Sequence, residues 1–228
     1  MRIEKGEAVK LATIQKLGGF ALIAGAILFA TYSVLFLSLF PAGEIHRDFS
    51  RIVLSPPWIG VAAIAFVGVV LMVFGFAAVY SRLHQGAGAL GLVGFVFIEV
   101  AYLLQACKVT WEIFLYPIIA GNPSSVALLR DGILWDHPLV HAFKAGASAT
   151  IFLGILLFCF ALVRSKEFPK AAGILIFVGA LVYALGPVLS MMVAIGGIIV
   201  LSLGCLLLGL ELIRDRQGCG VATSGQDL

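Results

Sequence analysis

Long apolar stretches alternate with short polar segments along almost the whole chain. A helix needs about 20 predominantly apolar residues to cross the hydrocarbon core of a bilayer. The pattern therefore predicts an all-α polytopic transmembrane bundle, in which residues 17–212 form a single six-helix domain. The expected spans are residues 17–40, 57–80, 87–116, 138–163, 171–186 and 188–210.

Two of these spans have unusual limits. The third is long for one crossing, so we expect it either to protrude from the bilayer or to stop near Lys108 and continue as an interfacial turn. No polar linker separates the fifth span from the sixth. Gly186-Pro187 is the expected break between them, because proline has no N–H to donate and disfavours a helical conformation in the residue before it.

The distribution of lysine and arginine predicts the orientation. Loops on the cytoplasmic side are enriched in these residues. Placing both termini in the cytoplasm puts most of them inside, with residues 1–16 as a juxtamembrane segment and residues 213–228 as a disordered tail. The same orientation puts all three tryptophans at the outer interface, where amphipathic rings are favoured. The inner basic residues are then Arg2, Lys5, Lys10, Lys16, Arg82, Arg164, Lys166, Lys170, Arg214 and Arg216, and the tryptophans are Trp58, Trp111 and Trp135.

Composition agrees with a membrane location. Hydrophobic residues make up 61% of the chain and charged residues 12%, whereas soluble domains carry roughly 25% charged residues. The lipid bilayer is therefore the expected partner, and the net charge of +3 gives no indication of nucleic acid binding. The four cysteines include no CxxC pair, so neither a disulfide framework nor a zinc site is indicated.

Glycines recur at heptad spacing within several spans. Small residues on one face let membrane helices approach each other closely. We therefore expect these glycines to lie at helix–helix interfaces. The pairs are Gly18 and Gly25, Gly68 and Gly75, and Gly197 and Gly204.

Ionisable and polar side chains inside the third and fourth spans are the candidate site. Charged groups there cost roughly 2.5–3.5 kcal/mol on insertion scales, so each needs a structural or functional reason. Lys108 and Glu112 stand at i, i+4 spacing and are expected to neutralise each other. Together these side chains predict a polar pocket that opens outward between the two spans. Its lining would be Glu99, Tyr102, Gln105, Lys108 and Glu112 from the third span, and His141, Lys144 and Ser148 from the fourth.

Within this pocket we expect Glu99 and Lys144 to lie at nearly the same depth. They are the charges placed deepest in the spans, and opposite charges attract strongly where water does not screen them. The prediction is that they share one cavity, paired directly or joined through Tyr102, Gln105 or water. His141 would then lie near the outer mouth of that cavity.

Three functions fit these residues. The pocket could bind or pass a small polar or anionic solute. The protein could instead be a structural or accessory subunit, in which buried ion pairs only fix the helix register. A redox or metal-handling subunit would use ligands at the outer face. These ligands would be His46, Asp136, His137 and His141, although no cofactor, haem or metal is predicted as such. The chain has no catalytic signature, so we do not expect an enzyme.

Residues 166–187, KEFPKAAGILIFVGALVYALGP, carry a resemblance to a known family. They resemble the span-opening motif of a bacterial family of small uncharacterised six-helix integral membrane proteins, with a basic turn, a proline and a glycine-rich helix. The order of spans, the segment Tyr80-Ser81-Arg82-Leu83 and the acid within the third span also fit. The resemblance implies the fold and a multi-pass location in the cytoplasmic membrane. It implies no activity and no catalytic residues.

Overall fold

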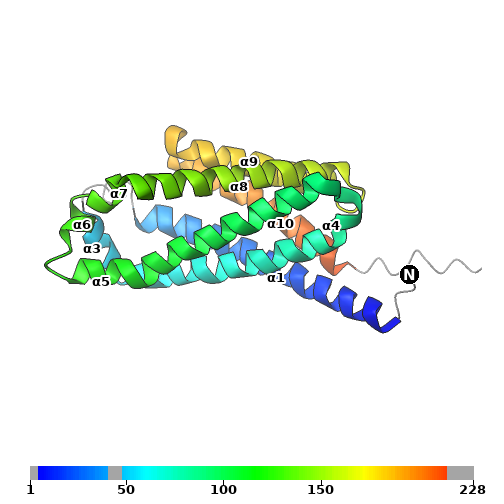
Figure 1. Cartoon of the computed structure of the whole chain (residues 1–228), viewed down its shortest axis with the longest axis horizontal. Coiled ribbons are helices and arrows are strands. Elements are labelled where there is room, and N and C mark those ends of the chain that lie inside the picture. Colours follow the sequence, from blue (N-terminus) through cyan, green and yellow to red (C-terminus); the bar gives the residue numbers. More distant parts are fainter. Residues whose placement is uncertain (1–4, 41–47, 215–228) are drawn as a thin grey trace, which may run out of the picture.

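The structure is a computed structural model that describes residues 5–40 and 48–214, and within these ranges it contains helices and no strand. The long helices are α1 (Lys5–Leu39), α4 (Pro57–Thr110), α8 (Pro138–Arg164), α9 (Lys170–Leu189) and α10 (Met191–Ile213), and they run along the long axis of the molecule (Figure 1). Short helices gather at one end: α3 (Phe49–Val53), the π-helix η1 (Trp111–Leu115), α5 (Tyr116–Gly121), α6 (Ala127–Arg130) and α7 (Ile133–Asp136). The predicted tail beyond residue 214 and His46 lie outside the described residues.

Helix α4 contains two of the predicted spans. Its path reverses near Gly88, whose φ of 58° and ψ of −163° are not helical. Glycine adopts a positive φ without the steric penalty that a Cβ would bring. The two arms of α4 therefore lie antiparallel, as Figure 1 shows, and Tyr80 stacks on Phe95 with ring centroids 4.4 Å apart.

The long helices pack in a closed order. Helix α1 packs against α4 and α10, α10 against α9, α9 against α8, and α8 against α4. We call the end that carries His84, Arg164, Lys170 and Ile213 the basic end. The opposite end, which carries Trp58 and the short helices, is called the aromatic end.

Within the described residues, five helical segments are long and apolar enough to cross a membrane. They are Thr13–Leu39, Pro57–His84, Gly86–Gly121, Pro138–Arg164 and Met191–Ile213, and a shorter apolar helix covers Lys170–Gly186. Large apolar side chains such as Phe20, Phe74 and Leu203 point outward rather than into the core. An all-α bundle with this surface is a multi-pass membrane protein, because only lipid covers such a face without cost.

The glycines predicted to pack helices do so. A Cβ on Gly25 would lie 3.0 Å from the backbone nitrogen of Met72, and one on Gly75 would lie 2.8 Å from the Cα of Leu22. These pairs fix the contact between α1 and α4. Gly197 and Gly204 likewise face the backbone of α9. Close approach through small residues gives the dispersion contacts that hold helices together in lipid.

One predicted helix limit was wrong. The break between the last two helices does not fall at Gly186-Pro187, since α9 continues to Leu189. Ser190 makes the break: its backbone is extended, and its hydroxyl accepts a hydrogen bond from the Val193 N–H at 3.3 Å, which caps α10. Of the two alternatives for the third span, the structure follows the longer one: the helix does not stop near Lys108 but continues through η1 to Gly121.

Candidate functional site

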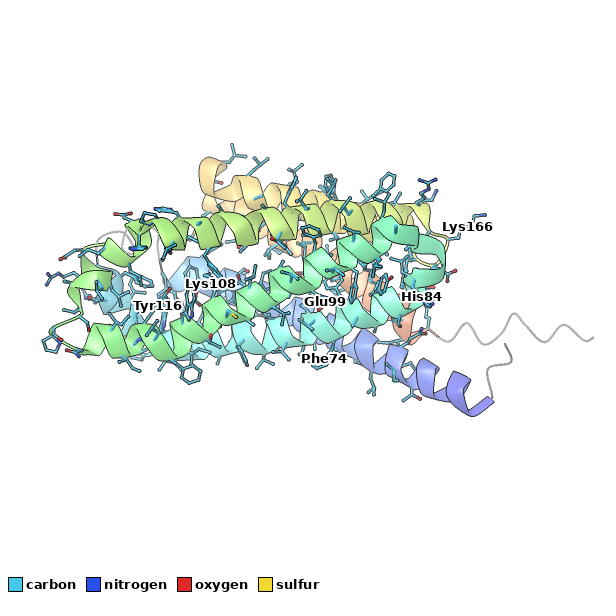
Figure 2. All side chains as sticks on the ribbon, viewed as in Figure 1. Phe74, His84, Glu99, Lys108, Tyr116 and Lys166 are labelled. Carbon is cyan, nitrogen blue, oxygen red and sulfur yellow. The ribbon has the colours of Figure 1, made fainter. Side chains whose placement is uncertain are left out.

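An ion pair within the third span is the centre of the candidate site. Lys108 Nζ lies 3.1 Å from Glu112 Oε1, and the side chain of Glu112 is only 5% exposed. The predicted i, i+4 pairing of these two residues is therefore confirmed. Figure 2 shows Lys108 toward the aromatic end of the bundle. A buried carboxylate stays ionised only where a cation or strong donors compensate it.

Pro117 leaves the backbone carbonyl of Glu112 without a helical hydrogen-bond donor. The Tyr116 N–H bonds to the Trp111 carbonyl, five residues back, and the segment Trp111–Leu115 is a π-helix. Continuing this pattern, the Glu112 carbonyl would accept from residue 117, but Pro117 has no N–H. Trp58 supplies the missing donor, with its Nε1 2.8 Å from the Glu112 carbonyl oxygen. Single π-turns occur frequently at functional sites.

Aromatic side chains enclose the same region. Trp58, Tyr116 and Tyr32 are all buried. Tyr32 of α1 and Tyr116 of α5 both lie within electrostatic range of the Glu112 carboxylate. We call Lys108, Glu112, Tyr32 and Tyr116, together with Lys144 of α8, the polar site. Tyrosine offers a hydroxyl at the end of an apolar ring, which suits polar recognition in an otherwise apolar wall.

The packing of α8 against α4 places Lys144 level with Lys108. A Cβ on Gly94 would lie 2.5 Å from the Phe158 nitrogen, and one on Gly154 would lie 2.8 Å from the Ile98 nitrogen. In this antiparallel register each residue forward along α4 matches one backward along α8, so position 144 of α8 lies at about the level of position 108 of α4. The Trp111 and Phe143 rings, 5.1 Å apart, show that the helices still touch at this level.

The electrostatics of Lys144 agree with that register. The charge of Lys108 acts on Lys144 more strongly than that of Asp136 does. Lys144 is half-buried, and so is Lys108. The two lysine charges therefore lie within electrostatic range of each other on neighbouring helices, and Lys108 is paired with the Glu112 carboxylate.

The predicted depth match between Glu99 and Lys144 was wrong. Glu99 follows Ile98, which packs against Gly154. It therefore lies nine residues deeper in the bundle than Lys108, whereas Lys144 lies at the level of Lys108. Nine residues correspond to about 14 Å of helix. No ion pair joins Glu99 to Lys144, and the buried Oε1 of Glu99 has no hydrogen-bond partner. Figure 2 shows Glu99 near the middle of the bundle, away from Lys108.

The remaining predicted site residues have different surroundings. Tyr102 is buried, stacks on Phe76 with centroids 5.6 Å apart, and lies near Glu99 rather than in the polar site. Gln105 is half-buried. His141 and Ser148 are exposed on α8.

Among the described residues, the proposed metal ligands Asp136, His137 and His141 do not form a site, and the fourth, His46, lies outside them. His137 Nδ1 accepts the Leu139 N–H at 3.3 Å and so caps α8. Asp136 and His141 are exposed. Among the described residues no three histidine, cysteine, aspartate or glutamate side chains stand close enough to hold a metal ion.

Two structural features near the ends of the bundle were not predicted from the sequence. Trp58 was expected at the membrane interface, but it is 2% exposed because α3 and α5 cover this end of the bundle. Arg82 was used only in the charge distribution and in the family resemblance, and its tertiary contacts were not predicted. It donates to the Glu211 carbonyl at 2.8 Å and the Glu167 carbonyl at 3.4 Å, and it stacks over the Phe168 ring at 5.0 Å. Pro117 was the signal that could have pointed to an unusual backbone near Glu112.

The chain matches no family model, no curated protein and no solved structure. The chemistry of the polar site is therefore the basis for a functional conclusion. Two ammonium groups, one carboxylate and two phenol hydroxyls can hold a small anion through charge-assisted hydrogen bonds. Nothing in the set forms the nucleophile–base geometry of a covalent catalyst.

Proposed function

We propose that the protein binds a small anionic solute at the polar site, as part of passing it across the membrane or sensing it. The observation that supports the proposal is that Lys108 and Lys144 lie at about one level on neighbouring helices, within electrostatic range of each other. Like charges repel strongly at low dielectric, so an anion held between them would be stabilised there.

The proposal also includes the orientation of the protein. The bundle lies in the cytoplasmic membrane with the basic end inside, as the positive-inside rule favours. The polar site then lies in the outer half of the membrane and is reached from outside. Helix α9 serves as the sixth span, although its apolar part, Lys170–Gly186, is shorter than the others. Membership in the uncharacterised six-helix family would agree with this arrangement.

Thermal unfolding in detergent tests anion binding. The purified protein would be heated with acetate, succinate, sulfate or phosphate, each compared with chloride at constant ionic strength. A bound ligand raises the unfolding temperature by mass action. We expect at least one of these anions to stabilise the parent protein, and Lys144→Met or Lys108→Met to abolish that stabilisation.

A matched control separates the site from general charge effects. Lys170→Met removes a lysine at the basic end, far from the site, and should leave anion stabilisation unchanged. Equal stabilisation of all variants, or no difference between any anion and chloride, would contradict the proposal.

The tight Lys108–Glu112 pair also favours a purely structural role. In that case Lys108→Met alone should destabilise the protein, because it removes the cation beside a buried carboxylate, and adding Glu112→Gln should restore stability. A solute site predicts that the double variant folds but no longer responds to anions.

A further inference from the structure

A second site lies at the basic end, where the two arms of α4 meet the end of α8. A cavity of about 340 Å³ opens there, and six of the residues that line it are Gly86, Gly88, Ala89, Leu90, Phe160 and Arg164. It is far from the polar site, and the proposed function does not use it. Figure 2 shows His84 and Lys166 at this same end of the molecule.

Small residues in the α4 turn create this cavity. Gly86 comes close to α8, since a Cβ on it would lie 3.9 Å from the Ser165 Cβ. Gly88 faces open space, and no atom lies within 4 Å of its ideal Cβ position. Larger side chains in this turn would close the cavity, and the positive φ of Gly88 makes any other residue there strained.

The lining combines an apolar wall with one cation. Leu90 and Phe160 are exposed large apolar residues, and Arg164 is exposed at the last turn of α8. Within the described residues the Arg164 side chain forms no ion pair or hydrogen bond. Glu167 and Glu211 are acids at this end of the bundle, and both pair with Arg82 rather than with Arg164. A guanidinium that no acid satisfies, beside an apolar wall, is complementary to an amphiphilic anion.

We propose that this cavity binds one anionic phospholipid, with its phosphate on Arg164 and an acyl chain along Leu90 and Phe160. The cavity stands where the apolar spans end, which is the depth of the lipid headgroups. Guanidinium forms paired hydrogen bonds with phosphate oxygens. Basic pockets between transmembrane helices are a recurrent form of anionic lipid recognition.

Native mass spectrometry of the intact protein tests the proposal. The protein would be titrated with phosphatidylglycerol and, separately, with phosphatidylcholine of identical acyl chains. The parent should retain one phosphatidylglycerol in preference to phosphatidylcholine. Arg164→Gln should weaken that binding about tenfold, the loss expected for one charge-assisted hydrogen-bonded pair.

Two further variants separate the effect of the cavity from the effect of nearby positive charge. Lys166→Gln removes a charge from the same loop without altering the cavity lining, and its effect should stay below about twofold. Ala89→Leu fills the cavity without changing any charge and should weaken binding as Arg164→Gln does. If Arg164→Gln fails to fold, Ala89→Leu decides the question alone.

The outcomes separate lipid from other anions. Equal loss in Arg164→Gln and Lys166→Gln would indicate only a positive surface and would overturn the site. Equal retention of the two lipids would overturn it as well. Inorganic phosphate at millimolar concentration should not displace phosphatidylglycerol; full displacement would show that the cavity takes a free anion and would refute the lipid assignment.

Discussion

Replacing glycine by alanine adds one methyl group. At two glycines of α8 this substitution should have different effects on the free energy of unfolding. At Gly154 the new Cβ would lie 2.8 Å from the Ile98 nitrogen, 2.9 Å from Ile98 Cγ1 and 3.0 Å from the Phe97 carbonyl carbon. Two of these three atoms are backbone atoms of α4, which cannot turn aside as a flexible side chain would. At Gly146, on the same helix, nothing lies within 4 Å of the Cβ position.

The two substitutions share one energetic contribution and differ in another. Alanine is favoured over glycine in a helix by about 1 kcal/mol, and this gain applies at both positions. Gly154→Ala must also push α4 and α8 apart, and such overpacking costs about 1–3 kcal/mol. Gly146→Ala should therefore stabilise the protein, and Gly154→Ala should leave it about 1–3 kcal/mol less stable than Gly146→Ala.

Unfolding by sodium dodecyl sulfate in mixed micelles measures this difference, because the detergent separates packed helices. The free energy of unfolding would be compared for the parent and both variants from tryptophan fluorescence. Gly154→Leu extends the series and should destabilise further. If Gly154→Ala proves as stable as Gly146→Ala, α4 and α8 do not meet at Gly154. The register that places Lys144 opposite Lys108 would then be wrong as well.

Three further predictions concern other parts of the fold. Trp58→Phe should cost about 1–3 kcal/mol in the same assay, because it leaves the buried Glu112 carbonyl without its donor; an equal stability would show that this carbonyl finds another partner. Arg82→Met should cost about 3 kcal/mol, since it removes a nearly buried cation from Glu211, whereas Arg214→Met, at a side chain 82% exposed, should cost less than about 1 kcal/mol. Hydrogen bonds from the Ser50 hydroxyl and the Arg51 N–H hold the pKa of Asp48 below its usual range. The capping of α3 should therefore persist above the ordinary carboxyl pKa and weaken as the pH falls through the lowered value, seen as faster amide exchange at Arg51, with Asp48→Asn insensitive to pH.

Hydropathy was enough to predict the class of fold. Residues such as Phe20, Phe74 and Leu203 belong to apolar runs that no soluble body could cover, so a helical membrane bundle followed from length and composition. Close helix packing at Gly25 and Gly75 also followed, because a missing side chain at heptad spacing serves that purpose in lipid. The Lys108–Glu112 pair could be predicted as well, because the two residues stand four positions apart on one continuous helical segment.

Everything that depended on how one helix lies against another was decided by tertiary structure. Hydropathy does not set the relative depth of two spans, so only the packing of Gly94 and Gly154 showed that Lys144 lies level with Lys108 and not with Glu99. Trp58 donates to the carbonyl of Glu112, which lies 54 residues away along the chain, so this contact could not be predicted locally. Local sequence fixes which groups are costly in a membrane, whereas the partners that offset those costs come from segments that only folding brings together.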